Sequence, residues 1–198
     1  MIGLILALAL APVQAQPAPQ RSSPEALRTI QAFGACIADA STAKASATLA
    51  SDFRTPGYRR AMDQLVETNR LCAGSRGWAR MRASRLLLAG AIAERLIERD
   101  GTPVNRALAK AATRPAASSY SPTDSAAVCV VRSVPDDVGA LFASDVASAE
   151  EDAAAKAIAP VMSRCLNNPV TVTTDGLRAM LATAAFRSIH AATADSRS

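Results

Sequence analysis

Apolar residues in the first part of the chain recur every three or four positions, which is the period of an amphipathic helix. Leu27, Ile30 and Ile37 follow this spacing behind a Ser-Pro-Glu start. Serine caps a helix, proline suits its first position, and an acid suits its first turn. We therefore predict a helix over residues 24–40.

Three more helices are predicted before residue 100. Residues 42–51 predict a short helix, and Thr55 followed by Pro56 predicts the start of a third. The fourth covers residues 80–99, where one apolar stripe includes an arginine. This stripe consists of Met81, Arg85, Leu88, Ile92 and Leu96.

The same pattern recurs 93 residues later, which indicates an internal duplication. Eleven of the 65 positions in residues 33–97 are identical in residues 126–190, and five of these are alanine pairs. The other six are Cys36/Cys129, Ser51/Ser144, Asp52/Asp145, Cys72/Cys165, Arg85/Arg178 and Leu88/Leu181. Because both cysteine pairs and the Ser-Asp pair keep one register without a gap, we interpret the two segments as copies.

The second copy predicts helices at matching places. Residues 135–144 begin with a proline and two acids, and Ser148 with Glu151 forms a capping box. Pro160 should kink the helix that follows or shift its start. The last helix is predicted over residues 174–192.

Strand signals are few, since aromatic residues make up only 4% of the chain. We predict an all-α protein of two similar disulfide-stapled helical repeats, with about four helices each, after a cleaved signal peptide. The connector between the repeats is expected to hold a helical stretch at residues 106–113. The predicted divisions are residues 1–15 as signal peptide, 16–23 as flexible lead-in, 24–100 as repeat 1, 101–122 as connector, 123–193 as repeat 2 and 194–198 as frayed tail.

The apolar run at residues 2–11, followed by Val13-Gln14-Ala15, has the pattern of a secretory signal peptide. It departs from that pattern because no positive residue precedes the run, which a mis-set start codon would explain. An uncleaved anchor and a chance apolar start are the alternatives. The run is shorter than the ~20 residues that cross a bilayer. We predict no transmembrane segment in the mature chain, and a periplasmic or secreted location.

Four cysteines in an exported chain predict disulfides. Of the three possible pairings, the duplication favours Cys36–Cys72 and Cys129–Cys165, because each copy then closes on itself. A metal site is not expected, since closely spaced cysteine or histidine ligands are missing and His190 is the single histidine. No cofactor is predicted.

Arg85 and Arg178 carry the sharpest polar signal, since each is predicted to lie on the apolar stripe of its helix. A buried arginine needs a partner of opposite charge. The aspartate that repeats at the same offset would supply one, and we predict the structural ion pairs Asp52–Arg85 and Asp145–Arg178. The alternative is that both arginines bind a small anionic ligand.

The net charge of +5 is unevenly distributed. Residues 16–100 carry +5, residues 101–122 carry +3 and residues 123–198 carry −3. We interpret the difference as surface divergence between the copies. A basic face for an anionic surface is the alternative.

Catalytic chemistry has little support in the sequence, and we predict that the protein is not an enzyme. No nucleophile motif, paired carboxylates or phosphate-binding glycine loop accompanies His190. The basic stretch around Trp78 is interpreted as a solvated helix face. An anionic envelope polymer or lipid headgroups are its alternative partners, and nucleic acid is not expected. This stretch contains Arg76, Arg80, Arg82 and Arg85.

Several stretches of the second copy resemble a group of small exported bacterial proteins of unknown function, which have tandem cysteine-bearing helical repeats. These stretches are Cys129-Val130-Val131-Arg132, Ala143-Ser144-Asp145, Ser148–Glu151, Cys165 and Leu177-Arg178-Ala179-Met180-Leu181. The resemblance covers most of the mature chain. It implies export and duplication, and it assigns no activity or binding residue.

The expected function is that of an exported, non-catalytic interaction or cell-envelope-associated protein, whose partner would be an unknown protein or envelope component. The alternative is a small anionic-ligand-binding protein that uses Arg85 and Arg178. A pocket lined by both arginines would favour the ligand. An apolar groove between the copies would favour a protein partner. The sequence leaves the oligomeric state open.

Overall fold

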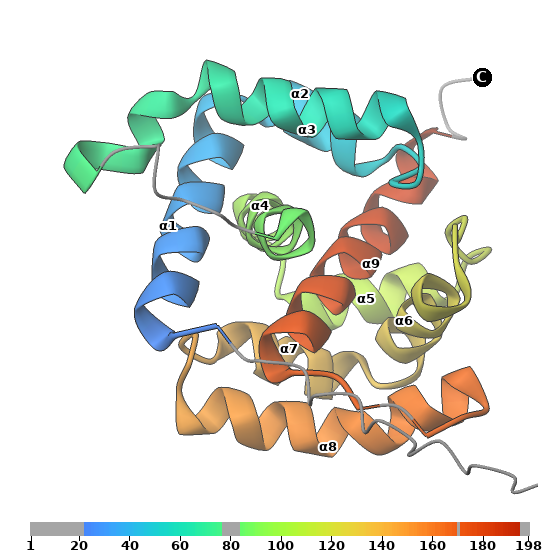
Figure 1. Cartoon of the computed structure of the whole chain (residues 1–198). Helices are drawn as coiled ribbons and strands as arrows, with labels where there is room; N and C mark the ends of the chain where they lie inside the picture. The colour runs from blue at the N-terminus through green and yellow to red at the C-terminus, as the bar shows by residue number, and fades with distance from the viewer. Residues whose placement is uncertain (1–21, 77–83, 170, 195–198) are drawn as a thin grey trace, which may run out of the picture.

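The computed structural model describes residues 22–76, 84–169 and 171–194, and these residues form helices and connecting turns without strands (Figure 1). The predicted all-α class is confirmed. The predicted signal peptide lies outside the described residues. The helices are α1 (Pro24–Ala40), α2 (Thr42–Leu49), α3 (Pro56–Thr68), the 3-10 helix η1 (Arg70–Arg76), α4 (Arg85–Arg99), α5 (Val104–Ala112), α6 (Pro122–Ser133), α7 (Pro135–Ala143), α8 (Ala149–Leu166) and α9 (Thr174–Ala194).

Hydroxyl caps begin five of these helices. The side-chain oxygens of Ser23, Thr55, Ser121, Ser148 and Thr173 each accept a hydrogen bond from the amide three residues on. These bonds satisfy N–H groups that have no partner within the first helical turn. Helices α1, α3 and α8 therefore begin where their caps predict. Pro160 lies inside α8 and does not shift its start.

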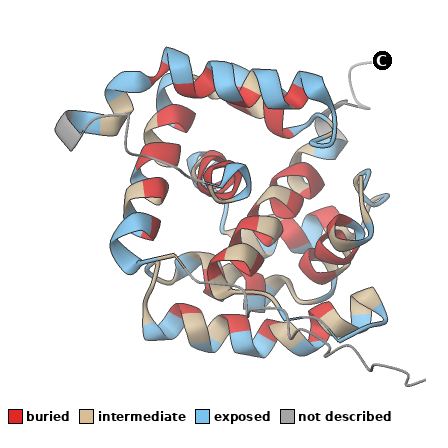
Figure 2. Ribbon diagram, in the orientation of Figure 1, coloured by how far each residue is buried: buried red, intermediate tan, exposed pale blue. Residues whose placement is uncertain are grey.

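Helices α4 and α9 pack against each other at the centre of the molecule (Figure 1). Helix α4 also packs on α1 and α2, whereas α9 packs on α5, α6, α7 and α8. The two central helices approach closely at Gly90, where a Cβ atom would lie 2.6 Å from the Ala179 Cα. In Figure 2, the outer helices α1 and α8 turn buried residues inward. One core therefore joins the first segment, α1 to α4, to the second segment, α6 to α9.

Two disulfides confirm the predicted pairing, Cys36–Cys72 and Cys129–Cys165. Their Cα atoms lie 5.6 Å and 6.0 Å apart. The first joins α1 to η1, whereas the second joins α6 to α8. Disulfides persist in oxidising compartments, so both fit a location outside the reducing cytosol. In the described part of the chain, no helix is long and apolar enough to cross a membrane.

Several helix ends differ from the predictions by one or two residues. Helix α2 ends at Leu49 and α7 ends at Ala143, before the predicted ends at 51 and 144. The connector helix α5 begins at Val104, and its buried Leu108 packs into the core. Helix α4 begins at Arg85. Residues 77–83, where part of this helix was predicted, lie outside the described residues.

Candidate functional site

Arg178 lies at the centre of a buried ion cluster, which we call the Arg178 cluster. Its guanidinium donates to both oxygens of the Glu94 carboxylate, at 2.9 Å from Nε and 2.7 Å from Nη2. Nη1 donates to Glu151 Oε1 at 3.2 Å and to the Ser144 carbonyl at 3.0 Å. Nη2 also donates to the Phe142 carbonyl. All three nitrogens are therefore used, and the cluster ties α4 of the first segment to α8 and α9 of the second.

The Arg178 cluster contains more negative than positive charge. One guanidinium faces two carboxylates, and Asp175 lines the same cavity of about 30 Å³. Burial raises the pKa of Glu94, and the hydrogen bond and charge of Arg178 only partly oppose this rise. Burial acts to lower the pKa of Arg178, but Glu94 and Glu151 together hold it above its ordinary value. Among the described residues, no group of His, Cys, Asp or Glu could hold a metal ion.

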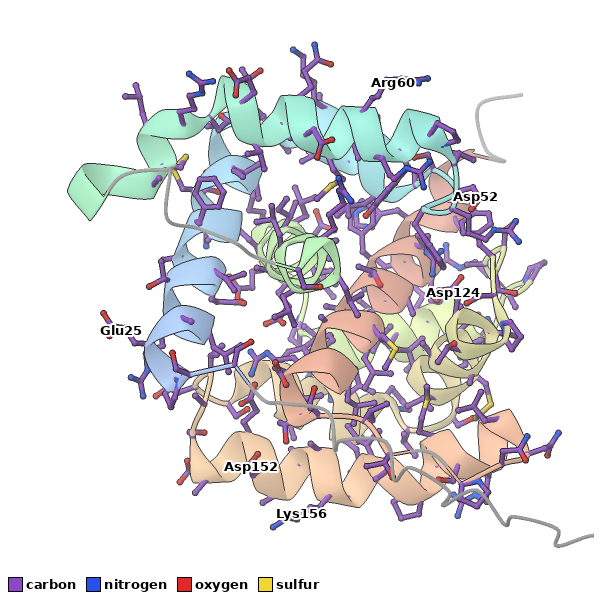
Figure 3. All side chains as sticks on the ribbon, in the orientation of Figure 1. Glu25, Asp52, Arg60, Asp124, Asp152 and Lys156 are labelled. Atoms are coloured by element: carbon purple, nitrogen blue, oxygen red, sulfur yellow. A yellow bond between two sulfur atoms is a disulfide. The ribbon has the colours of Figure 1, made fainter. Side chains whose placement is uncertain are left out.

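A larger cavity, of about 370 Å³, opens between α2, α3 and α4 of the first segment and α6 and α9 of the second. We call it the Arg187 pocket. Its charged lining residues are Arg59, Arg85, Arg187 and Asp124, the last of which is labelled at the start of α6 in Figure 3. Its larger apolar or aromatic lining residues are Leu49, Phe53, Tyr58, Leu86 and Met180. A cavity of this size with few polar groups is typical of a small-molecule site.

Arg187 is a buried arginine in the wall of this pocket. Its Nη1 donates to Asp124 Oδ2 at 3.1 Å, and its Nη2 donates to Asp124 Oδ1. The guanidinium carbon lies 5.2 Å from the ring centroid of Tyr120, which is a cation–π contact. Nε is buried and has no hydrogen-bond partner within the described residues. Most buried polar groups are paired, so this donor points to an unfilled interaction.

Tyr58 adds a hydroxyl group to the same lining. Its side chain is buried, and its hydroxyl has no hydrogen bond to any described residue. Burial raises the pKa of Tyr58, while the charges of Arg187 and Arg85 oppose that rise. The phenol therefore lies in the electrostatic field of two guanidinium groups.

Arg85 is the first residue of α4 and lines the pocket. Its side chain is 55% exposed and pairs with Asp63 at 3.3 Å. Helix N-termini favour anions, yet the first turn of α4 has no acid and its cap residue makes no side-chain cap bond. Arg59, on α3, has no ion-pair partner within the described part of the chain. This wall of the pocket therefore offers positive charge that the described residues only partly compensate.

The predicted Asp52–Arg85 ion pair is wrong. Asp52 accepts hydrogen bonds from the Arg54 amide at 2.9 Å and from the Arg54 guanidinium at 2.8 Å. A partner two residues away satisfies this carboxylate within its own turn. Arg85 is exposed because it begins α4, so its place on the predicted stripe does not bury it.

The predicted Asp145–Arg178 ion pair is also wrong, because Asp145 is not the partner of Arg178. Arg178 is buried, as the stripe predicts, but Glu94 and Glu151 are its carboxylate partners. Asp145 is exposed. The Ser-Asp triplet still contributes through Ser144, whose carbonyl accepts a hydrogen bond from Arg178.

The sequence-based reasoning missed Glu94, Glu151, Tyr58, Asp124 and Arg187. Part of the signal was present: Glu94 and Arg187 are 93 residues apart and carry opposite charges on corresponding helices. A comparison of the copies for reversed charges would have found this pair. A search for identical residues in the two copies finds only positions that keep their residue type, so it misses Glu94 and Arg187.

Arg85 and Arg178, predicted together as ligand anchors, do not share a pocket: Arg85 lines the Arg187 pocket, and Arg178 lies in the Arg178 cluster. His190 is half-buried on α9. Its Nδ1 lies 2.8 Å from the Phe186 carbonyl, and its Nε2 lies 3.2 Å from an Asp100 oxygen. Most of the basic stretch around Trp78 lies outside the described residues.

No protein-family model, curated protein or solved structure matches this chain. The resemblance to exported bacterial proteins therefore stays a prediction, as do the duplication and the domain divisions. Evidence for a function comes from the geometry of the Arg187 pocket and the Arg178 cluster.

Proposed function

We propose that this chain is an exported, non-catalytic binding protein that holds a small anionic molecule in the Arg187 pocket. The observation that carries the proposal is the excess of three arginines over one carboxylate in the lining of a largely apolar cavity. Guanidinium groups bind carboxylates and phosphates through paired N–H donors. Partial removal from water strengthens such contacts, so an anion gains more here than at an open surface.

The three arginines have different parts in this proposal. Arg187 is committed to Asp124 through both Nη atoms, so it acts mainly as a buried positive wall, and its Nε has no partner among the described residues. Arg85 has one exposed partner, and exposed ion pairs are weak. Arg59 has none among the described residues. Arg59 and Arg85 are therefore the residues that an incoming anion would contact first.

Export to the periplasm or the medium is part of the same proposal. Both disulfides support it, because they persist in oxidising compartments. Cleavage of the predicted signal peptide would leave Gln16 as the first residue of the mature protein. N-terminal sequencing of the protein from a periplasmic or culture fraction checks this, and an intact Met1 start there would contradict cleavage.

Fluorescence titration of the oxidised protein with 1-anilinonaphthalene-8-sulfonate tests the binding function, since this probe joins an anionic group to an apolar body. We expect saturable binding at one site. The double variant Arg59→Gln, Arg85→Gln should bind about tenfold or more weakly, because hydrogen bonds to charged groups are worth ~1.5–3 kcal/mol each. Near-UV circular dichroism checks that both proteins are folded.

Arg60→Gln is the matched control. Arg60 follows Arg59 on α3, is exposed, and is not part of the pocket lining (Figure 3). The proposal requires this variant to bind the probe as the wild-type protein does. Equal losses in the control and the double variant would contradict it, as would the absence of saturable binding by the folded wild-type protein.

A further inference from the structure

The Arg187 pocket and the Arg178 cluster are built from corresponding positions of the two segments. Nine residues that line the pocket lie 93 positions from residues that line the cavity of the cluster. Four of these pairs contain a charged residue: Arg85/Arg178, Arg187/Glu94, Tyr58/Glu151 and Asp124/Gln31, with the pocket residue first. The two sites can therefore be compared position by position.

The two sites differ in the partners that they offer to their arginine. In the cluster, two carboxylates meet Arg178. In the pocket, Arg85 stands at the corresponding position, but Arg187 and Tyr58 stand where the two carboxylates would be. Arg85 consequently has a second arginine and a phenol as its neighbours in the lining, in place of two acids.

The pocket is wider than the cavity that the carboxylates of the cluster line. The cavity of the cluster measures about 30 Å³, whereas the pocket measures about 370 Å³. Asp124 is the one acid that lines the pocket, and Arg187 uses both of its oxygens. Arg187 Nε is buried and has no hydrogen-bond partner within the described residues, and the Tyr58 hydroxyl donates to no described residue. A carboxylate from outside would supply what the sequence does not.

We infer that the ligand is an amphipathic monocarboxylate, whose carboxylate pairs with Arg85 as Glu94 and Glu151 pair with Arg178 in the cluster. This inference rests on the proposed function, because it names the class of anion that the pocket binds. The carboxylate accepts hydrogen bonds from the Tyr58 hydroxyl and the Arg85 guanidinium. Both donors suit it, since a planar carboxylate matches the guanidinium fork.

The apolar part of the ligand lies against the apolar walls of the pocket. Leu49, Leu86 and Met180 come from three different helices and line the same cavity. Leu86 is also one of the exposed large hydrophobic side chains. Covering such surface is favourable in proportion to the apolar area removed from water. A small hydrated anion would leave this area uncovered.

Charge selects a monoanion over a dianion. Three arginines of the lining face Asp124 in the lining and Asp63 beside it, which leaves one net positive charge. One carboxylate neutralises this charge. A phosphate dianion would leave an excess negative charge close to the buried Asp124, and such repulsion is strong where water is scarce.

Isothermal titration calorimetry of the oxidised, full-length protein tests the inference with four probes: decanoate, decanol, acetate and inorganic phosphate. Decanoate should bind at one site. Decanol keeps the chain but lacks the charge, and it should bind about tenfold or more weakly. Acetate and phosphate lack the chain, and each should bind about a hundredfold or more weakly, since each buried CH₂ adds ~0.8 kcal/mol.

Tyr58→Phe sharpens the test, because the Tyr58 hydroxyl has no partner in the described structure and its loss leaves the fold intact. This variant should bind decanoate about tenfold more weakly while its affinity for decanol stays unchanged. Arg60→Gln is again the control and should bind both probes as the wild-type protein does. Equal decanoate affinity in the Tyr58→Phe and wild-type proteins would overturn the assigned contact.

The outcomes separate this inference from the proposed function. Phosphate binding as tightly as decanoate would overturn the amphipathic carboxylate and leave an anion-binding pocket. Decanol binding as tightly as decanoate would overturn the carboxylate contact. If neither decanoate, phosphate nor the fluorescent sulfonate binds the folded protein, the proposed function fails together with the inference.

Discussion

The Arg178 cluster and the Arg187 pocket occupy corresponding positions of the two segments, yet only the cluster pairs its arginine with two buried carboxylates. In the cluster, two buried carboxylates meet one guanidinium and join α4 to α8 and α9. In the pocket, Tyr58 and Arg187 replace those carboxylates, and a cavity of about 370 Å³ remains. A few polar side chains therefore determine whether such a place between helices is closed by buried ion pairs or keeps a cavity.

Arg178→Ala should have the largest effect on this comparison. It leaves two buried carboxylates without their cation, and breaking a buried pair costs about 3–5 kcal/mol. Arg85→Ala removes the corresponding residue of the pocket, whose ion pair with Asp63 is exposed. That loss should be at most ~1 kcal/mol. Urea unfolding of both variants under oxidising conditions measures the free energy of unfolding.

The decisive quantity is the difference between the two losses in the free energy of unfolding. Similar losses for both variants would mean that the cluster and the pocket contribute alike to stability. In that case the buried ion pairs of the cluster would not distinguish it from the pocket. Unchanged near-UV circular dichroism in Arg85→Ala confirms that this variant is a fair reference.

Glu94→Gln should change how stability depends on pH. Burial raises the pKa of Glu94 above its ordinary value of 4.5, so the native state binds a proton more tightly than the unfolded chain does. The stability from this group is fully present below the unfolded pKa and is lost as pH rises through the raised native pKa. On acidification from pH 8 toward pH 4.5, the wild-type protein should therefore gain stability relative to Glu94→Gln.

Other carboxyl groups do not disturb this measurement. The pKa of Asp39 is lowered, mainly by its hydrogen bond to Arg95, and the pKa of Asp52 is lowered by its hydrogen bond to Arg54. On acidification, the stabilisation that these two groups contribute is lost, but it is lost equally in the wild-type protein and in Glu94→Gln. The difference between the two urea-unfolding series isolates Glu94, and parallel curves would show that burial does not raise its pKa.

The smallest effect is expected at the two aspartates of the repeated Ser-Asp triplet. Asp52→Asn weakens the bonds to Arg54, and an exposed pair of this kind contributes little to stability. Asp145→Asn changes an exposed residue and should stay within ~0.5 kcal/mol of the wild-type protein. Thermal unfolding measures which of the two variants loses more stability. A larger loss in Asp145→Asn than in Asp52→Asn would reverse this part of the comparison.

Local signals in the sequence determined much of the fold. Ser23, Thr55 and Ser148 begin helices at the predicted places, because a cap acts on amides only three residues away. The equal spacing of the cysteines predicted both disulfides, since each bridge closes its own segment. The apolar stripe predicted that Arg178 is buried. Each of these conclusions needs only short distances along the chain or the register between the copies.

The packing of the helices determines which groups meet the buried arginine and where the pocket opens. Glu94 reaches Arg178 across 84 residues, because α4 and α9 pack closely at Gly90 and Ala179. The repeated aspartates suggested other partners, but Asp52 is satisfied within its own turn by a neighbour. Long-range pairing depends on how helices pack, and a pattern read along one chain does not contain that geometry.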